Sequence, residues 1–227
     1  MRINETVSTD PLFANCLSLF HRWLCAQIFY GLKSHHIDVH GMKTKAEFLN
    51  AHRDFIRNQG APSTLRRDNA LEEASAEVVA TNRKLHIKDE WSEPHHQHQN
   101  TVESGANKWL KSETHSLLDR TGAPDSAWFF ALLYLAMVWN YTYHPAIDMT
   151  PHQARHGVPP DISALLQFSF WEPVLYLDHE HSFPSTRERS GWWVGVSEHV
   201  GDSLTYMIID DQTKRLVHRS VSWFDHQ

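Results

Sequence analysis

The chain has 227 residues, enough for one large domain or for a medium domain followed by a small one. Its hydrophobic content of 41% and charged content of 21% are ordinary for a globular protein. The net charge of −6 argues against a protein that wraps nucleic acid through bulk positive charge, although protonation of its 18 histidines would reduce this deficit.

Cysteine content and hydropathy indicate the cellular compartment. Cys16 and Cys25 form neither a CxxC motif nor a disulfide pattern, so we expect two inert thiols in a reducing environment. No apolar run approaches the ~18 residues that a membrane span needs. The N-terminus also lacks the basic-then-apolar layout of a signal peptide. We therefore expect a soluble intracellular protein with no membrane partner.

The first ninety residues alternate short strands with helices. The β-branched run at residues 5–10 predicts a first strand, which Pro11 should end because proline cannot continue a central strand. Further strands are predicted at residues 23–32, 36–40, 63–68 and 86–91, and helices at residues 43–58 and 71–85. The apolar face of the first helix is expected to comprise Ala46, Leu49, Phe55 and Ile56.

A polar loop followed by an amphipathic helix occupies residues 92–111. Asn100 is a good N-cap, and Glu103 lies where a carboxylate closes a capping box. An apolar stripe is formed by Val102, Ala106, Trp109 and Leu110, and a polar stripe by Glu103, Asn107 and Lys111. A single Glu in this setting is typical of a cap on a solvated helix. Acidic residues upstream, at strand ends, favour a functional interpretation.

The remainder of the chain changes from helix to strand. A very apolar helix, capped by Asp125 or Ser126, is predicted to end at Asn140 and to be part of the core. Thr150 and Pro151 then begin a short helix that ends at Gly157. After a boundary at residues 158–160, strands are predicted at 173–177, 191–196, 204–209 and 215–221, a spacing that suggests a small barrel.

Three carboxylates occupy comparable positions in this order of elements. Asp10 closes the first strand, Asp68 closes the fourth strand, and Glu103 lies in the helix after the fifth. In an open α/β sheet, such side chains can converge near the strand ends. Two charges ~4 Å apart repel by roughly 4 kcal/mol at an effective dielectric of ~20. A divalent metal offsets this repulsion, and oxygen ligands suit Mg²⁺ or Mn²⁺, a pair of which supports in-line phosphoryl transfer.

These residues resemble the catalytic core of retroviral-type integrases. The likeness rests on Asp10, on residues 65–69 (Leu-Arg-Arg-Asp-Asn), and on the Gln97-x-Gln-Asn-x-x-Glu103 motif. Between Asp68 and Glu103 there are 34 residues, close to the roughly thirty-five of that family's Asp–Asp–Glu signature. The likeness extends to copia-type LTR retrotransposon polyproteins, whose β-rich segment after the integrase core resembles residues 150–160, 170–177, 191–196 and 210–221.

The resemblance implies a role for each candidate residue. Asp10, Asp68 and Glu103 would be catalytic ligands of Mg²⁺ or Mn²⁺, with Glu103 also orienting the nucleophile. DNA would be contacted by Gln99, Asn100, Asn107 and Lys111. Arg66 and Arg67 would meet phosphate or form a surface salt bridge.

The expected fold class is α/β. An RNase H-like core, a mixed five-stranded sheet with helices, is predicted for residues 1–150, followed by a connector at 151–164 and a small SH3-like β domain at 165–227. The expected activity is polynucleotidyl transfer: 3′-end processing by water, then attack of the 3′-hydroxyl on target double-stranded DNA. By resemblance we expect a homo-oligomer that reaches the nucleus through cytoplasmic particles, and a chain that is a piece of a polyprotein.

Several features depart from the integrase pattern. The family's zinc-binding His-His-Cys-Cys module is missing, and His95, His96 and His98 do not replace it because they offer no fourth ligand at a structural-zinc spacing. From residue 165 onward there are five Lys and Arg against nine Asp and Glu, a balance of −4 where a DNA-binding barrel should be basic. We accordingly interpret Trp192 and Trp193 as barrel core rather than as a base-stacking platform.

Two alternatives therefore stay open. One is an inactive transposon-derived remnant that binds nucleic acid or oligomerises. The other is an RNase H-type nuclease, for which Asp125 or Asp148 would supply the fourth acid that nuclease relatives carry near a C-terminal helix.

Overall fold

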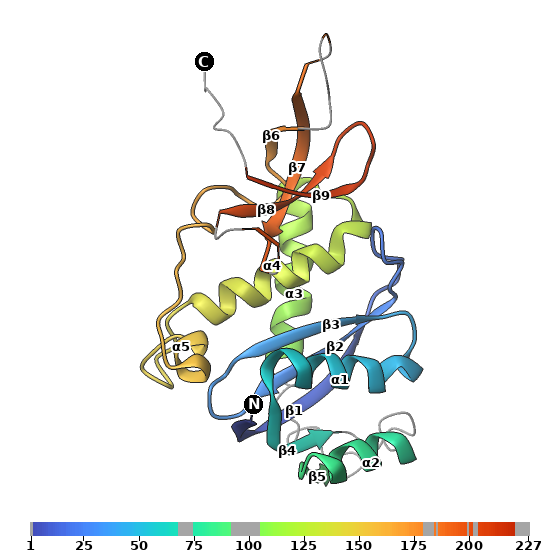
Figure 1. Cartoon of the computed structure of the whole chain (residues 1–227), viewed down its shortest axis with the longest axis vertical. Helices are drawn as coiled ribbons and strands as arrows, with labels where there is room; N and C mark the ends of the chain where they lie inside the picture. Colours follow the sequence, from blue (N-terminus) through green and yellow to red (C-terminus); the bar gives the residue numbers. More distant parts are fainter. Residues whose placement is uncertain are drawn as a thin grey trace.

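The computed structural model describes residues 2–67, 75–91, 105–178, 184, 186–198, 200–201 and 204–220. Within these ranges, a five-stranded sheet and a four-stranded sheet lie on opposite sides of helix α4 (Trp128–Tyr141), as Figure 1 shows. The α4 helix contacts β3 of the larger sheet and β7 of the smaller one. The two sheets are thus joined through one helix.

The larger sheet has the strand order β3-β2-β1-β4-β5. Its strands are β1 (Arg2–Phe13), β2 (Cys25–Gly31), β3 (Ile37–Met42), β4 (Ala61–Arg67) and β5 (Lys88–Trp91). The first three strands pair antiparallel as successive hairpins, whereas β4 pairs parallel with β1 and β5 parallel with β4. This mixed five-stranded sheet with its helices is the predicted RNase H-like core.

The expectation that Pro11 ends the first strand is wrong. Strand β1 continues to Phe13, and Pro11 lies opposite Gln27 of β2. The reason is that the parallel pairing of β1 with β4 ends at Ser8, which lies opposite Arg66. Among the described residues, β1 beyond Ser8 pairs only with β2. A proline is tolerated in a strand whose other side needs no ladder hydrogen bond.

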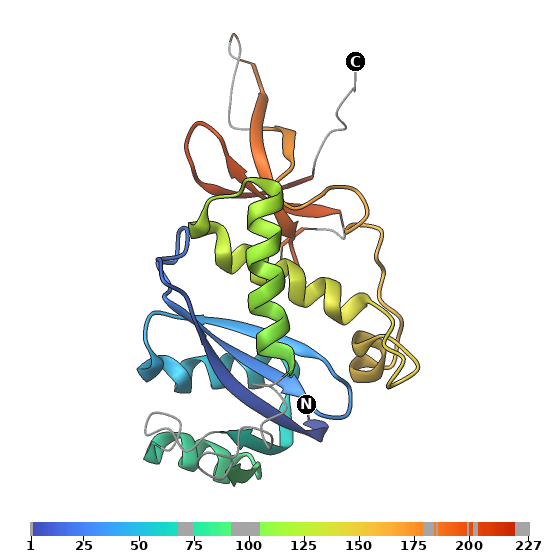
Figure 2. The ribbon, with the colours of Figure 1, turned by 180° about the vertical axis from the view of Figure 1, so that it is seen from behind.

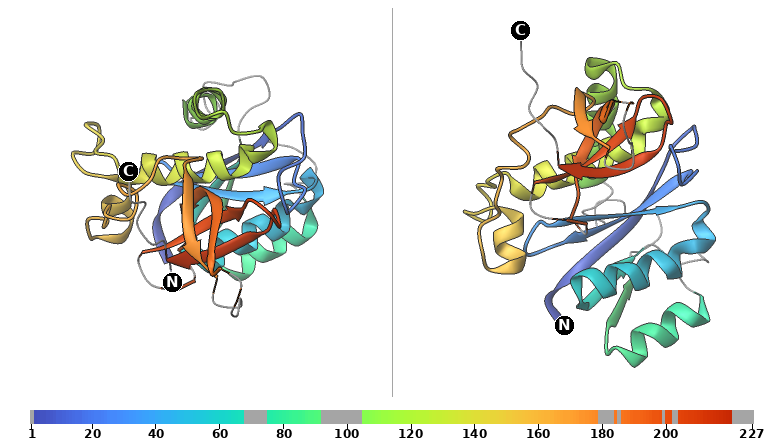
Figure 3. Two further views of the ribbon diagram at one scale, coloured as in Figure 1. Left: turned by 90° about the horizontal axis from the view of Figure 1, so that it is seen from above. Right: turned by 45° about the horizontal axis from the view of Figure 1, so that its top comes forward.

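Helices cover both faces of the larger sheet. Helices α1 (Phe48–Gln59) and α2 (Ala76–Lys84) pack on one face, and α4 lies on the other, as Figure 3 shows for α1 and α4. Strand β2 explains the division, because its side chains alternate between the two cores. Ala26 and Ile28 belong to the core around α4, and Cys25 and Phe29 to the core around α1.

Helix α1 begins later than the sequence pattern predicts. Residues 45–47 form a 3-10 turn, and the α-helix starts at Phe48. Its buried residues are Phe48, Ala51, His52 and Phe55. Ala46 is exposed, and Leu49 and Ile56 are half-buried. The buried face of α1 therefore differs from the predicted one. It includes His52, whose side chain is hydrogen-bonded to Asn82. The apolar pattern of the sequence did not indicate this hydrogen bond.

Helix α4 is apolar on most of its surface because it lies between two sheets. A 3-10 turn, Asp125–Ala127, precedes it, and no side chain forms the expected cap. A helix that is hydrophobic all round must be buried on more than one side. Among the described helices, none has both the length and the apolar character needed to cross a membrane, and α4 is no exception.

Helix α3 (Asn107–Thr121) runs lengthwise from the larger sheet toward the smaller one, which is visible in Figure 2. Residues 105 and 106 form a π-helical turn at its start, a feature frequent at functional sites. The helix ends at Thr121 and is followed by Gly122, whose φ of 69° is the left-handed conformation that glycine adopts without steric cost.

The C-terminal part follows its prediction closely. Helix α5 (Pro151–His156) is capped by Thr150, whose Oγ1 accepts a hydrogen bond from the Gln153 amide at 3.1 Å. The antiparallel strands are β6 (Pro173–Leu177), β7 (Glu188–Val196), β8 (Thr205–Asp210) and β9 (Leu216–Ser220), in sequential order. This small second sheet is compatible with an SH3-like domain. As predicted, Trp193 is core, while Trp192 is half-buried and stacks on Trp171.

Candidate active site

Asp10 lies on the central strand of the larger sheet. Its neighbour on β2 is Ile28, and it lies two residues beyond Ser8, where the pairing of β1 with β4 ends. The Asp10 residue is half-buried. Its carboxylate lies within reach of a helix that packs against the larger sheet.

That helix is α3, and the contact is made by Asn107. The Asn107 Nδ2 group donates a 2.5 Å hydrogen bond to Oδ2 of Asp10. Asn107 is only 3% exposed, and its Oδ1 atom is buried with no hydrogen-bond partner among the described residues. A short hydrogen bond to a carboxylate is of the charge-assisted kind. Two candidate residues 97 positions apart in the chain are thus brought together.

Packing of the first turns of α3 fixes this contact. Ala106 and Leu110 are buried in the core around α4. Trp109 packs on Trp139 of α4, with ring centroids 4.8 Å apart. These contacts leave Asn107 at the edge of the buried stripe, so its side chain turns inward to Asp10. Its surroundings differ from the solvated, DNA-facing position that the sequence predicts.

The solvent-facing side of α3 is basic near its start. Lys111 is exposed, as predicted, and so is Lys108, which the sequence interpretation did not include. His115 follows, with an 80% exposed side chain that lies 3.3 Å from Asp119. Lys108, Lys111 and His115 recur at spacings of three and four residues, which places them on one face of the helix. In the sequence, Lys108 could have been selected because it directly follows Asn107, a residue already predicted to belong to the site.

Arg66 and Arg67 both form ion pairs with the neighbouring strand β5. Arg66 Nη2 lies 3.1 Å from Glu90 Oε2, with both side chains 32% exposed. Arg67 Nη2 lies 2.5 Å from Asp89 Oδ1, and its side chain is completely buried over the ring of Trp91. Arg66 matches the salt-bridge alternative. The predicted DNA contact of Arg67 is wrong, because a side chain with no exposed area cannot reach a phosphate.

A buried polar chain extends from Arg67 into the helices on that face of the sheet. Asp89 accepts a hydrogen bond from Asn82 of α2 at 2.8 Å, and Asn82 in turn accepts one from Nε2 of His52 on α1, also at 2.8 Å. Burial lowers the pKa of His52 to about 4. The imidazole is therefore neutral at pH 7 and acts as a structural donor.

Four of the predicted site residues lie outside the described residues. They are Asp68, which follows Arg67 directly in the sequence, and Gln99, Asn100 and Glu103. Within the described ranges, no group of three or more His, Cys, Asp or Glu side chains is placed to hold a metal ion. The part of the expected ligand set that is described does fit Mg²⁺ or Mn²⁺, because the Asp10 carboxylate is a hard oxygen donor beside an unpartnered buried amide oxygen.

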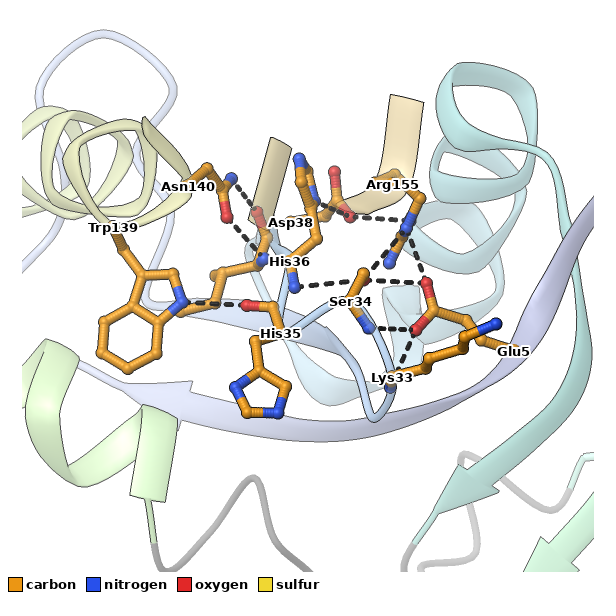
Figure 4. Close-up of polar contacts among 10 residues, drawn as sticks. Glu5, Lys33, Ser34, His35, His36, Asp38, Trp139, Asn140 and Arg155 are labelled. Atoms are coloured by element: carbon orange, nitrogen blue, oxygen red, sulfur yellow. Dashed lines mark hydrogen bonds and ion pairs between the residues drawn. The ribbon is translucent and has the colours of Figure 1, made fainter. Parts of the chain in front are cut away.

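A second buried polar network joins α5 to the larger sheet (Figure 4). Arg155 Nε lies 2.7 Å from Glu5 Oε1, and Arg155 Nη1 lies 3.8 Å from Asp38 Oδ2, while His36 Nδ1 lies 3.3 Å from the same Asp38 oxygen. Glu5 also accepts hydrogen bonds from the backbone amides of Lys33 and Ser34. The Arg155 side chain is only 2% exposed.

The network contains two carboxylates, one guanidinium and one imidazole. Burial alone would raise the pKa of Asp38, but His36 and Arg155 hold it below its usual value. Because Glu5 lies on β1 and Asp38 on β3, Arg155 fastens α5 to two strands at once (Figure 4). Sequence reasoning missed this network, since its members are up to 150 residues apart and no local pattern connects them.

Similarity to solved structures was found for most of the chain. The catalytic core domain of HTLV-2 integrase in complex with magnesium (trimeric form) matches with a TM-score of 0.53 and 17% identity, covering 69% of this chain and 99% of that chain. The simian T-cell lymphotropic virus intasome, solved with PP2A regulatory subunit B56 gamma, matches with a TM-score of 0.56 and 15% identity, covering 97% of this chain and 77% of that chain. The catalytic core domain of BIV integrase matches with a TM-score of 0.51 and 13% identity.

At sequence identities of 13–17%, similarity to these solved structures establishes the fold and not the function. The chain has the RNase H-like fold of retroviral integrase catalytic cores, and the intasome match extends over the smaller sheet as well. No protein-family model matches the sequence. No curated protein matches it either. Function must accordingly be argued from the site.

Proposed function

We propose that the chain is the integrase part of a copia-type LTR retrotransposon polyprotein, a polynucleotidyl transferase that joins element DNA to target DNA. The observation that carries this proposal is the hydrogen bond between Asp10, on the central strand of an RNase H-like sheet, and Asn107 at the start of α3. A carboxylate held in this way by a neighbouring helix is pre-oriented for metal binding.

The comparisons support the proposal at the level of fold and cofactor class. The similar structures are retroviral integrases, and the HTLV-2 cores were solved in complex with magnesium. We propose that Asp10, Asp68 and Glu103 hold Mg²⁺ or Mn²⁺. A divalent ion at such a site activates a water or a 3′-hydroxyl and neutralises charge on the phosphate. Dimeric, trimeric and intasome forms among these structures support a homo-oligomer acting on DNA.

The described residues of the chain have defined tasks in this reaction. Asn107 holds the Asp10 carboxylate through Nδ2. Lys108 and Lys111 offer exposed ammonium groups on α3, one and four residues after Asn107, where they can neutralise DNA phosphates. Phosphate contacts of this kind position the duplex and do not read its sequence.

A non-catalytic remnant is the alternative that a specific observation favours. The balance of −4 from residue 165 onward is opposite in sign to that expected for a DNA-binding domain. A remnant would keep the fold and the Asp10–Asn107 contact, and would lack metal binding or strand transfer. The two candidates therefore differ in measurable ways.

Isothermal titration of Mn²⁺ tests the site directly. We expect saturable binding to the wild type, and loss of that binding in Asp10→Asn and in Asp68→Asn, because each change removes a charged oxygen ligand. Asp119→Asn is the matched control, since Asp119 is an exposed carboxylate at the far end of α3. Binding that persists in both ligand variants would refute the assignment of these residues.

A strand-transfer assay with double-stranded DNA ends distinguishes an active integrase from a non-catalytic remnant. The wild type should join ends to target DNA with Mn²⁺, and Glu103→Gln should abolish joining while its unfolding midpoint stays unchanged. Metal binding without joining would support the remnant. Cleavage of an RNA–DNA hybrid in place of joining would support the nuclease alternative.

A further inference from the structure

The loop between β1 and β2, residues 14–24, is a tightly hydrogen-bonded turn at one end of the larger sheet. Ser18 N donates to Trp23 O, and Trp23 N donates to Ser18 Oγ, each at 2.9 Å. Leu19 N donates to Ser126 O at 2.8 Å, and Figure 2 shows the blue loop beside the turn that precedes α4. The loop is therefore held in place both by its own hydrogen bonds and by its neighbour.

Two aromatic rings of this loop form a stack on the end of the sheet. A Cβ atom on Gly41 of β3 would lie only 2.1 Å from Cε3 of Trp23, so the indole ring covers the backbone of Gly41. The imidazole of His21 lies parallel to the indole, with centroids 4.1 Å apart and planes at 14°. Since Gly41 occupies one face of the indole, His21 covers the other. His21 is exposed and so forms the outer layer of the stack.

The outer face of His21 suits a flat aromatic ligand. Among the described residues, Trp23 is the aromatic ring that stacks on His21, so the opposite imidazole face has no ring partner there. Burial of the covered face lowers the pKa of His21, which is therefore neutral at pH 7 and offers a ring rather than a charge. Nucleobases stack on histidine and other aromatic side chains in this way.

Cationic groups lie next to the stack. Residues 11–37, which include the whole loop, contain no Asp or Glu. Arg22 is exposed, and no carboxylate of the described chain forms an ion pair with its side chain. Two further exposed cations follow β3, namely Lys43 and Lys45, the second lying over the ring of Phe13 at 4.9 Å. Two carboxylates approach the base of the loop, Glu47 near Cys25 and Asp125 near Cys16. The loop thus has a slight positive excess in a chain of net charge −6.

The loop is also close to the candidate active site. It begins four residues after Asp10 on the same strand, which is about 13 Å along β1. That length corresponds to about four stacked nucleotides of one DNA strand. Because β1 and β4 are parallel, Asp68 follows β4 at this same end of the sheet. DNA bound for reaction at Asp10 would therefore pass next to the loop.

We propose that His21 and Arg22 bind an unpaired nucleotide of the DNA end that is held at Asp10. The base stacks on the outer face of His21, and a neighbouring phosphate accepts hydrogen bonds from the Arg22 guanidinium. This inference rests on the proposed function, which brings DNA to this end of the sheet. A nucleotide is the occupant chosen because it joins a flat ring to an adjacent anion, and so matches both side chains.

Fluorescence anisotropy without divalent metal tests the proposal on the full chain, because binding is then measured in the absence of reaction. The probes are a labelled DNA duplex with a short unpaired tail and the matched blunt duplex. We expect the wild type to bind the tailed duplex about tenfold more tightly. His21→Ala should reduce this preference to within about twofold, and His21→Phe should restore it because a ring is kept. Arg22→Gln should weaken binding of the tailed duplex and lower its salt slope by about one.

The controls remove similar groups far from the loop. Tyr143→Ala removes a 55% exposed ring just after the other end of α4, and Lys33→Gln removes an exposed cation from the turn between β2 and β3, at the opposite end of the sheet. Both should keep the wild-type preference for the tailed duplex. Unfolding midpoints should be unchanged in all five variants, since each side chain is exposed.

The outcomes separate this inference from the proposed function. No preference for the tail in the wild type, or a full preference in His21→Ala, would overturn the inference even if strand transfer is observed. Displacement of the tailed duplex by an acidic peptide as effectively as by single-stranded DNA would also overturn it, because the loop would then recognise negative charge alone. A preference that depends on His21 supports the inference, and the absence of strand transfer in that case would count against the proposed function only.

Discussion

At the scale of single residues, Asn107 and Arg67 show that burial determines which partner a polar side chain binds. Asn107 was expected to contact DNA, and Arg67 was expected to meet phosphate or to form a surface salt bridge. Both side chains have little or no exposed area. Arg67 forms an ion pair with Asp89 and lies over the ring of Trp91. These contacts stabilise the end of β4, which Asp68 follows in the sequence. Asn107 instead contacts Asp10 and acts as a positioning residue of the proposed site.

We predict that Asn107→Ala weakens Mn²⁺ binding by about tenfold or more, because partners that orient a metal ligand typically contribute a factor of ~10–100 to affinity. The Asp10 carboxylate would lose its donor and a defined orientation. Isothermal titration measures the affinity, and the metal-free unfolding midpoint reports any general loss of stability.

Ser116→Ala is the control, since this exposed α3 hydroxyl donates only within the helix, to Ser112 O. Wild-type Mn²⁺ affinity in Asn107→Ala would contradict the positioning role. Equal losses of affinity in both variants would point to a general effect on α3.

At the scale of elements, polar side chains fix helices to strands far away in sequence. Asn140, near the end of α4, both accepts from the Ile37 amide and donates to the Ile37 carbonyl, each at 2.8 Å, and so satisfies the edge of β3. Arg155 attaches α5 to β1 and β3. On the opposite face, His52 attaches α1 to α2 through Asn82.

The last of these contacts predicts a dependence of stability on pH. His52 has a pKa of about 4 in the folded chain and an ordinary value of 6.5 when unfolded. Between these values the unfolded state binds a proton that the folded state does not. Stability is thus fully present above about pH 6.5 and is lost as the pH falls toward 4, by an amount on the order of 3 kcal/mol for this group.

We expect His52→Gln to flatten this acid dependence, because glutamine cannot be protonated on unfolding. Urea unfolding midpoints at about pH 7 and about pH 5 measure the slope. His115→Gln removes an 80% exposed histidine and should keep the wild-type slope. An unchanged slope in His52→Gln would show that other histidines cause the acid sensitivity.

At the scale of the whole molecule, the two sheets share one hydrophobic core. Tyr134 of α4 packs on Trp193 and Phe170, with centroid distances of 5.7 and 5.6 Å. Residues of β2, α3, α4, β7 and β8 all belong to the same cluster. The cluster spans the predicted boundary between residues 1–150 and 165–227, so we expect the two parts to unfold together.

Trp193→Ala tests this expectation. The side chain is completely buried, and such a truncation costs about 3–5 kcal/mol. We expect faster amide hydrogen exchange in β2 as well as in β6 to β9, because loss of the smaller sheet uncovers α4. Leu177→Ala, at a 37% exposed side chain of β6, is the control and should change exchange only locally. Acceleration confined to β6–β9 in Trp193→Ala would mean that the two parts are independent.

Much of the fold could be predicted from the sequence because the signals are local. Strand β6 has the predicted bounds, and α5 is capped by Thr150 as its Thr-Pro start indicates. The assignment of Trp193 to the core also followed from its place in an apolar strand. Period-two and period-3.6 patterns report what one segment buries, and capping residues report where a helix begins.

The candidate site was predictable only in its composition. The sequence by itself selected Asp10, Asn107 and Lys111, and its predictions for Asp68, Gln99, Asn100 and Glu103 stand as predictions because those residues lie outside the described ranges. Only the tertiary structure decided that β1 continues through Pro11, that Asn107 turns inward to Asp10, and that Arg155 is buried between β1 and β3. Each of these depends on a neighbour supplied by a distant part of the chain, and local sequence patterns contain no information about that neighbour.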